Sequence, residues 1–197
     1  MQTLGISDSA ERSDSRLKSL FWPSVQSGAD VDYLGAQGYW VCTFVAVISF
    51  FLTLMTGRPL LAATLLLFYH FGGVGVRERD LFAAAIVFGS YALDTIVSLA
   101  FLMLGSPGGI VVRIAVSALL LSNLRATWIA SKWQPDSEQA ALPPRMGDTF
   151  SDKFADLWPQ WIWPKVRIIY YIFALGVVLI SMLGVTALLL RATHLNR

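Results

Sequence analysis

Three things are scarce in this sequence: charge, cysteine and histidine. Charged residues fill 14% of its 197 positions, whereas an average soluble domain has about 25%. Cys42 is the only cysteine, which excludes an intramolecular disulfide and a CxxC redox or zinc site. The formal net charge is only +2, and no basic cluster with interleaved aromatic residues occurs. We therefore expect no nucleic-acid partner.

The short motifs of common catalytic and cofactor sites are also missing. The sequence has no phosphate loop of the form GxxxxGK(S/T), no HExxH, no GxSxG and no Cys/His cluster at metal-ligand spacing. Its glycines at 72, 73 and 75 do not follow a strand, as a dinucleotide-binding loop would require. We predict no cofactor and no metal site. Whether the protein is an enzyme stays open, and a noncatalytic protein is the preferred interpretation.

What the sequence does contain is a series of long uncharged runs. About 20 apolar residues are enough to cross a bilayer as a helix, at a rise of 1.5 Å per residue. One such run, Leu81–Leu104, has a single charge near its middle, Asp94. The sequence thus predicts an all-α integral membrane protein with about five transmembrane helices in a bundle. The expected spans are residues 38–56, 60–76, 81–104 and 110–130, which form a core over 38–130, and a last span within the segment 166–197.

Two polar segments lie outside these spans. Residues 1–37 form a predicted N-terminal tail, in which Ser15–Trp22 is either a short amphipathic helix or disordered. Residues 131–165 form a predicted cytoplasmic-side loop. Its apolar residues recur at helical spacing over about 149–163, which indicates an amphipathic interfacial helix or, alternatively, a soluble cap. Aromatic rings with a polar tip favour the headgroup level. The expected interfacial anchors are Tyr39, Trp40, Trp158, Trp161 and Trp163.

The distribution of Lys and Arg predicts the orientation. With five spans, the N-terminal tail, the 77–80 connector and the 131–165 loop share one side. They carry three, two and four Lys or Arg residues, against three on the opposite side. Lys and Arg concentrate on the cytoplasmic side. We therefore predict a plasma (inner) membrane protein with its N-terminus in the cytoplasm and its C-terminus outside.

The candidate functional site lies near mid-depth in the predicted bundle. An ionised Asp in hydrocarbon costs at least about 2.5–3.5 kcal/mol on insertion scales, so Asp94 should face other helices and be paired or protonated. At 1.5 Å per residue, polar side chains from three predicted spans reach a similar depth. This candidate substrate or proton pathway consists of Asp94, His70, Asn123, Arg125 and Tyr91.

Two roles are open for this group. In the first, which we favour, Asp94 pairs with Asn123 and Arg125 and holds the third and fourth spans in register. Such a role needs only one polar pair between the two spans. A hydrogen bond inside a membrane contributes on the order of 0.6–2 kcal/mol to stability. In the second role, the group forms a polar chamber that binds a solute or relays protons. His70 would then be the side chain that titrates near neutral pH.

Three functional hypotheses follow. The leading one is a noncatalytic multi-pass subunit or scaffold, whose partners are membrane lipids and other membrane proteins or a second copy of itself. The first alternative is a small solute transporter or proton-coupled channel that uses the intramembrane group. The second alternative is an enzyme acting on lipid-type substrates through the charged connector Arg77–Asp80, although we expect that connector to be a solvated loop.

Overall fold

The computed structural model describes residues 21–100, 107–134, 141, 150 and 153–195. Within these residues the regular structure is entirely helical, which confirms the all-helical prediction. Five of the helices are long and apolar enough to cross a membrane, as expected of an integral membrane protein. The predicted amphipathic segment of the tail lies almost wholly outside the described residues. The helices are α2 (Gly28–Met55), α3 (Pro59–Arg77), α4 (Leu81–Ala100), α5 (Pro107–Ala130), the short π-helix η2 (Lys153–Leu157) and α7 (Trp158–Leu195).

Helix α2 begins ten residues before the predicted start of the first span. Ser27 is its N-cap, and the Asp30 backbone N–H donates to Ser27 Oγ at 3.4 Å. In return, Asp30 Oδ2 accepts from the Ser27 backbone N–H at 3.1 Å. This reciprocal capping box satisfies N–H groups that a helix start leaves free. Residues 28–37, which the sequence predicts as part of the tail, are therefore helical. Asp32 lies in the second turn of α2.

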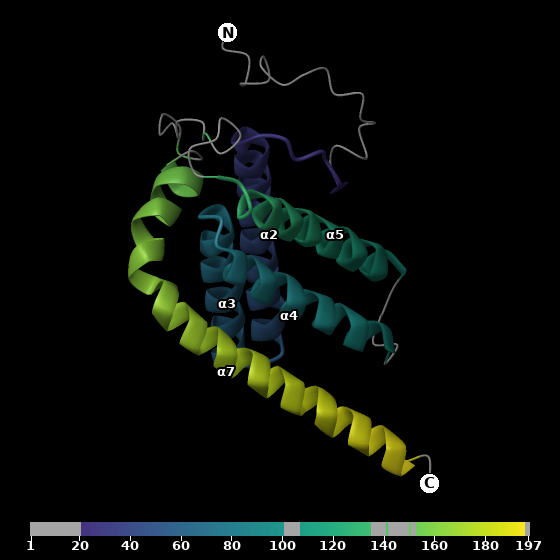
Figure 1. Cartoon of the computed structure of the whole chain (residues 1–197). Coiled ribbons are helices and arrows are strands. Elements are labelled where there is room, and N and C mark those ends of the chain that lie inside the picture. Colours follow the sequence, from purple (N-terminus) through teal and green to yellow (C-terminus); the bar gives the residue numbers. More distant parts are fainter. Residues whose placement is uncertain (1–20, 101–106, 135–140, 142–149, 151–152, 196–197) are drawn as a thin grey trace.

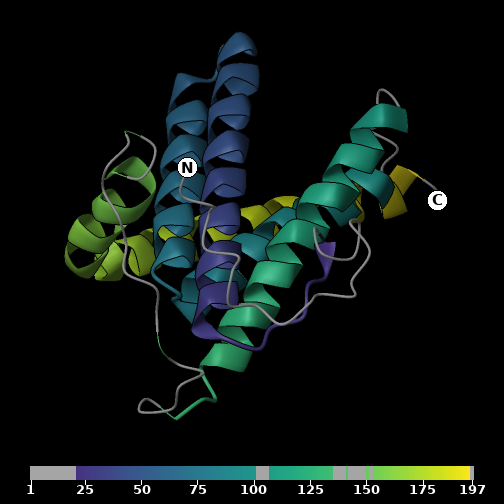
Figure 2. The same cartoon turned by 90° about the horizontal axis from the view of Figure 1, so that it is seen from above.

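Helices α2 and α3 form an antiparallel hairpin, and they lie side by side in both views (Figure 1 and Figure 2). The turn between them uses Gly57 at a φ of +74°, a left-handed conformation that glycine adopts without strain. Pro59 then occupies the first position of α3, where its missing N–H costs nothing. The turn lies where the sequence predicts it.

The other helices pack around this hairpin. Helices α4 and α5 contact each other, and α4 also packs on α3 while α5 packs on α2. Figure 1 shows α4 and α5 running across the hairpin, and α7 curving round the side of α3 before it extends beyond the other helices. The bundle is therefore most compact around the C-terminal half of α3.

Glycines make this compact region possible. A methyl group at Gly73 would lie 2.7 Å from Cys42 Cβ on α2. One at Gly75 would lie 2.5 Å from both Ala83 Cβ on α4 and the Trp163 ring on α7. Small residues let neighbouring backbones approach closely in membrane proteins, where packing replaces the hydrophobic driving force between helices. These glycines of α3 therefore set its distance to three neighbouring helices.

The last helix differs from its prediction. We expected an interfacial helix over 149–163 and a separate span from 166, but α7 continues through Pro164 as one helix of 38 residues. A proline inside a helix removes one backbone hydrogen bond. Trp163 before it packs at Gly75, and Tyr170 after it packs at Gly72, so contacts with α3 hold both sides of the proline.

Candidate functional site

The five predicted site residues do not meet at one place. Asn123 lies where α5 crosses α2, and its Nδ2 donates to the Leu34 carbonyl oxygen at 3.0 Å. Arg125 Nη1 instead donates to the Pro23 carbonyl oxygen at 2.9 Å, and its guanidinium lies 4.8 Å from the centre of the Trp22 ring. Asn123 therefore joins α5 to α2, and Arg125 joins α5 to the segment before α2. Neither side chain contacts Asp94.

His70 lies in a cluster of aromatic rings. The centre of its ring is 6.2 Å from that of Tyr39 and 6.3 Å from that of Phe154. Tyr91 belongs to a different group, with its ring 6.2 Å from that of Tyr69. Of the predicted group, only Tyr91 and Asp94 share a common surface, the wall of a cavity.

Asp94 has a different partner from the one we predicted. Its Oδ2 lies 2.5 Å from Arg113 Nη1, so the ion pair is with Arg113 rather than Arg125. The reason is geometric. Arg125 is twelve residues further along α5, about 18 Å at the helical rise, whereas Arg113 is close to the turn that joins the antiparallel α4 and α5. The Asp94–Arg113 pair links α4 and α5, without the contribution of Asn123 and Arg125 that we predicted.

The cavity beside this ion pair is large. It has a volume of about 1140 Å³ and lies between α2, α3, α4, α5 and α7. Its walls are mainly apolar, with side chains such as Ile48, Phe68 and Val116. The Asp94 side chain is 59% exposed and the Arg113 side chain 34% exposed, so both charges are accessible. Ligand pockets typically measure about 300–1,000 Å³, so this space exceeds the usual range.

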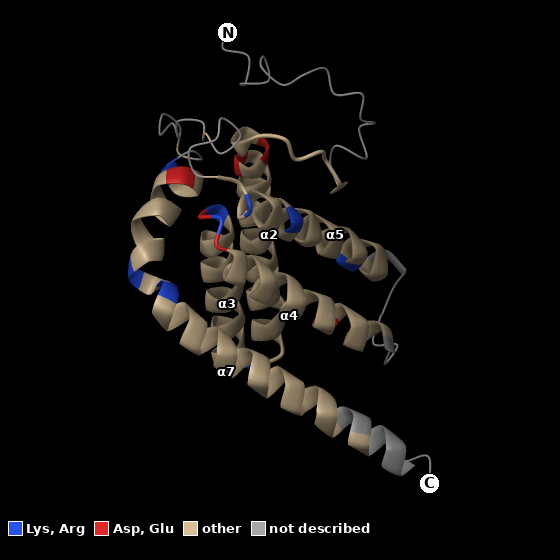
Figure 3. Cartoon of the chain, viewed as in Figure 1, with Lys and Arg blue, Asp and Glu red and all other residues tan. Residues whose placement is uncertain are grey.

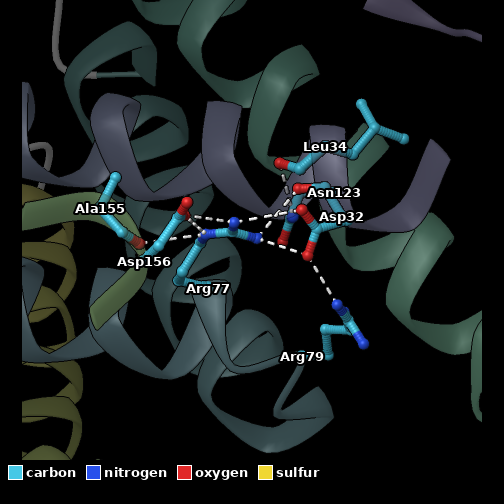
Figure 4. A network of polar contacts seen from close by, with 7 residues as sticks. All are labelled: Asp32, Leu34, Arg77, Arg79, Asn123, Ala155 and Asp156. Carbon is cyan, nitrogen blue, oxygen red and sulfur yellow. Dashed lines mark hydrogen bonds and ion pairs between the residues drawn. The ribbon is translucent and has the colours of Figure 1, made fainter. Parts of the chain in front are cut away.

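A second polar centre, which the sequence did not reveal, lies at the end of α3. Arg77 is only 2% exposed, and its Nη1 and Nη2 lie 2.8 Å from Oδ1 and 3.1 Å from Oδ2 of Asp32 (Figure 4). Its Nη2 also lies 2.5 Å from Asp156 Oδ1, and its Nε donates to the Ala155 carbonyl oxygen at 3.1 Å. Arg79 Nη2 adds a contact of 2.6 Å to Asp32 Oδ1. We call the side chains of Asp32, Arg77, Arg79 and Asp156 the Arg77 network.

The Arg77 network ties together segments that are far apart in the sequence. It joins α2, the end of α3 with the connector that follows, and η2 just before α7. Its two guanidinium groups and two carboxylates balance in charge. Buried charges are tolerated when they are paired with good geometry, and the two-pronged contact between Arg77 and Asp32 is such a geometry. We interpret the network as a set of contacts that holds α2, the end of α3 and η2 together.

The connector Arg77–Asp80 is therefore not the solvated loop that we expected. Arg77 is buried in the network, Arg79 is bound to Asp32, and Asp80 Oδ1 accepts from the backbone N–H groups of Phe82 and Ala83 at the start of α4. Carboxylates are favourable at helix N-termini. The charges of this connector thus serve helix ends and packing, which weakens the hypothesis of an enzyme that uses them on lipid headgroups.

The predicted interfacial anchors divide into buried and exposed residues. Tyr39 is fully buried and Trp163 is 5% exposed, and both belong to the hydrophobic core. Trp40 and Trp161 are 42% and 58% exposed. The ammonium of Lys165 lies 3.5 Å from the centre of the Trp161 ring, a cation–π contact at the surface. Tyr39 and Trp163 therefore act in packing, and Trp40 and Trp161 retain the position of surface anchors.

No group of three or more His, Cys, Asp or Glu side chains that could hold a metal ion occurs in the described part of the chain. The chain matches no known family model, no curated protein and no solved structure.

Proposed function

We propose that this chain is a noncatalytic multi-pass protein of the plasma (inner) membrane, which acts as a subunit or scaffold through other membrane proteins. The observation that supports this most is the outer part of α7. Only 11% of the most apolar 18-residue window of this helix is buried within the chain, against 28–44% in the other four candidate spans. The helix leaves the bundle and presents its sides to other molecules.

The exposed face of α7 is apolar and includes a glycine. No charged residue occurs from Ile168 to Leu190, and the large exposed side chains there include Leu175, Leu179 and Leu183. A methyl group at Gly176 would meet nothing within 4 Å. Glycine on the outer side of a membrane helix allows a second helix to approach closely. The partner we propose is thus a transmembrane helix, from a second copy or from another membrane protein.

The length of α7 supports a helix that is partly interfacial. At 1.5 Å per residue, 38 residues extend about 57 Å, whereas a bilayer hydrocarbon core is about 30 Å thick. We propose that the segment up to about Lys165, with Trp161 exposed, lies at the cytoplasmic headgroup level. Figure 3 shows Lys and Arg on this segment and near the end of α3. Under the proposal, the N-terminus is cytoplasmic and the C-terminus is outside.

Site-specific photo-crosslinking tests the proposal. A photoreactive amino acid is placed at Leu179 on α7 or, as the matched control, at Phe51 on α2. The two side chains are similarly exposed, at 52% and 57%. We expect a protein adduct of defined mass from Leu179 in native membranes and only lipid adducts from Phe51. Lipid adducts alone at both positions would show that α7 has no protein partner.

A small transporter or proton-coupled channel is the second candidate. The position of Asp94 on the cavity wall favours it, because a carboxylate beside a cavity inside a membrane often marks an ion or proton path. Asp94→Asn should then abolish flux in proteoliposomes while the protein stays folded. Unchanged flux in a folded variant would remove this candidate.

A further inference from the structure

We propose that the cavity between α2, α3, α4, α5 and α7 binds one zwitterionic phospholipid. Its phosphate would contact Arg113, its ammonium would contact Asp94, and its acyl chains would fill the apolar part. This proposal does not depend on the protein partner proposed for α7.

The size and lining of the cavity indicate an apolar ligand larger than most metabolites. Its volume of about 1140 Å³ is above the 300–1,000 Å³ that is typical of pockets for drug-sized molecules. Five helices contribute to its wall, and most of the lining side chains are aliphatic or aromatic. Acyl chains match such a surface, since they offer apolar area and require no hydrogen bonds.

The ion pair on the wall indicates the chemistry of the headgroup. Arg113 has five N–H donors, and the contact with Asp94 Oδ2 is made by Nη1 alone. The other oxygen of Asp94 can also accept. In apolar surroundings such unused donors and acceptors are costly. A headgroup with both a phosphate and an ammonium would satisfy them, and it would keep the site electrically neutral.

The ion pair lies near the start of α5 and on the wall of the cavity. Arg113 lies six residues after Pro107, about 9 Å along α5 from the start of that helix. Arg side chains extend towards an interface while their stems stay in apolar surroundings. Tyr69 and Tyr91 add polar groups to the same wall. The apolar side chains Val45 and Phe68 line the same cavity and offer a surface for the acyl chains.

Two glycines provide a matched pair of variants. Gly89 on α4 lines the cavity, and a methyl group there would meet nothing within 4 Å. Gly89→Phe therefore puts a large side chain on the cavity wall, at a position where the first added atom has no close neighbour. Gly176 on α7 has equally free space but does not line the cavity. Gly176→Phe is the control, and it should instead reduce the α7 crosslink of the proposed function.

Native mass spectrometry of the detergent-solubilised full-length protein tests the site. The protein is mixed with equal amounts of phosphatidylethanolamine, phosphatidylglycerol and phosphatidylcholine. We expect one bound phosphatidylethanolamine or phosphatidylcholine per chain, in preference to phosphatidylglycerol. Arg113→Gln should lower its occupancy roughly tenfold, as expected for a lost charge-assisted hydrogen bond. Gly89→Phe should abolish binding, and Gly176→Phe should leave it unchanged.

Two results would overturn the proposal. One is equal retention of all three lipids by the original chain, which would mean that the headgroup is not recognised. The other is unchanged binding by folded Gly89→Phe, which would place the lipid elsewhere. Should Arg113→Gln fail to fold, Gly89→Phe decides the question alone, because the Cβ that it adds at the cavity wall has no close neighbour.

Discussion

The two ends of this bundle differ in how closely their helices pack and in how exposed their charged side chains are. At the end of α3, glycines bring four helical segments together, and the charged side chains of the Arg77 network pair around the buried Arg77. Around Asp94 and Arg113, the helices diverge, a cavity of about 1140 Å³ remains, and the ion pair is accessible. At the first end the charged side chains are mostly buried and pair within the chain, whereas at the second the cavity leaves Asp94 and Arg113 open to other molecules. We infer that stability resides mainly in the first end and interaction in the second.

The largest expected effect comes from breaking the Arg77 network. Arg77→Met leaves Asp32 and Asp156 without their central partner in a buried site. Removing one partner of a buried ion pair costs about 3–5 kcal/mol. We expect a loss of this size in the free energy of unfolding, measured by SDS-induced unfolding in mixed micelles with circular dichroism.

A triple variant is the control for this comparison. Arg77→Met combined with Asp32→Asn and Asp156→Asn removes the stranded charges and should recover part of the loss, because it is the unpaired charge that is costly. If Arg77→Met unfolds at the same SDS fraction as the original chain, the network does not stabilise the bundle.

An effect of intermediate size on the free energy of unfolding is expected from Gly→Ala changes at Gly75, which is closely packed, and at Gly89, which is not. A methyl group at Gly75 would lie 2.5 Å from Ala83 Cβ and the Trp163 ring, whereas one at Gly89 meets nothing within 4 Å. Overpacking a core costs about 1–3 kcal/mol, and Gly→Ala in an unhindered helix gains about 0.5–1 kcal/mol. Gly75→Ala should therefore destabilise the protein and Gly89→Ala should stabilise it, in the same SDS assay. Equal effects at both positions would contradict the difference in packing.

The smallest effect is expected at the ion pair of the cavity. Asp94 is 59% exposed, so other polar groups can replace its contact with Arg113, and the loss of that contact should cost less than a break in the buried Arg77 network. Asp94→Asn should accordingly shift the SDS midpoint far less than Arg77→Met does. A loss as large as that of Arg77→Met would show that both ends are equally structural.

The sequence predicts the helices of this protein well and their polar contacts poorly. Uncharged runs and the Gly57–Pro59 turn are local signals, so the helical class and the first hairpin follow from them. The partners in the Arg77 network are 45 and 79 residues apart, and no local spacing links them. The capping pattern Ser27–Asp30 could have moved the start of α2, and with it Asp32, into the bundle.

Depth along a helix is likewise too weak a criterion for choosing contacts. Asp94, Asn123 and Arg125 come to similar depths when helices are assumed to be parallel to the membrane normal. In the structure α4 and α5 cross the hairpin instead, and Asn123 faces Leu34 while Asp94 faces Arg113. Crossing geometry is set by small residues on several helices at once, which a single sequence does not rank.

The Arg77 network also has a consequence for biosynthesis. Translation delivers Asp32, Arg77 and Arg79 first, and Asp156 follows 79 residues after Arg77. Until then Arg77 can pair with Asp32 but not with Asp156. Asp156 becomes available just before α7 emerges, because η2 directly precedes that helix. The contact that joins the α2–α3 hairpin to the segment before α7 therefore forms only after α2, α3, α4 and α5 have been synthesised.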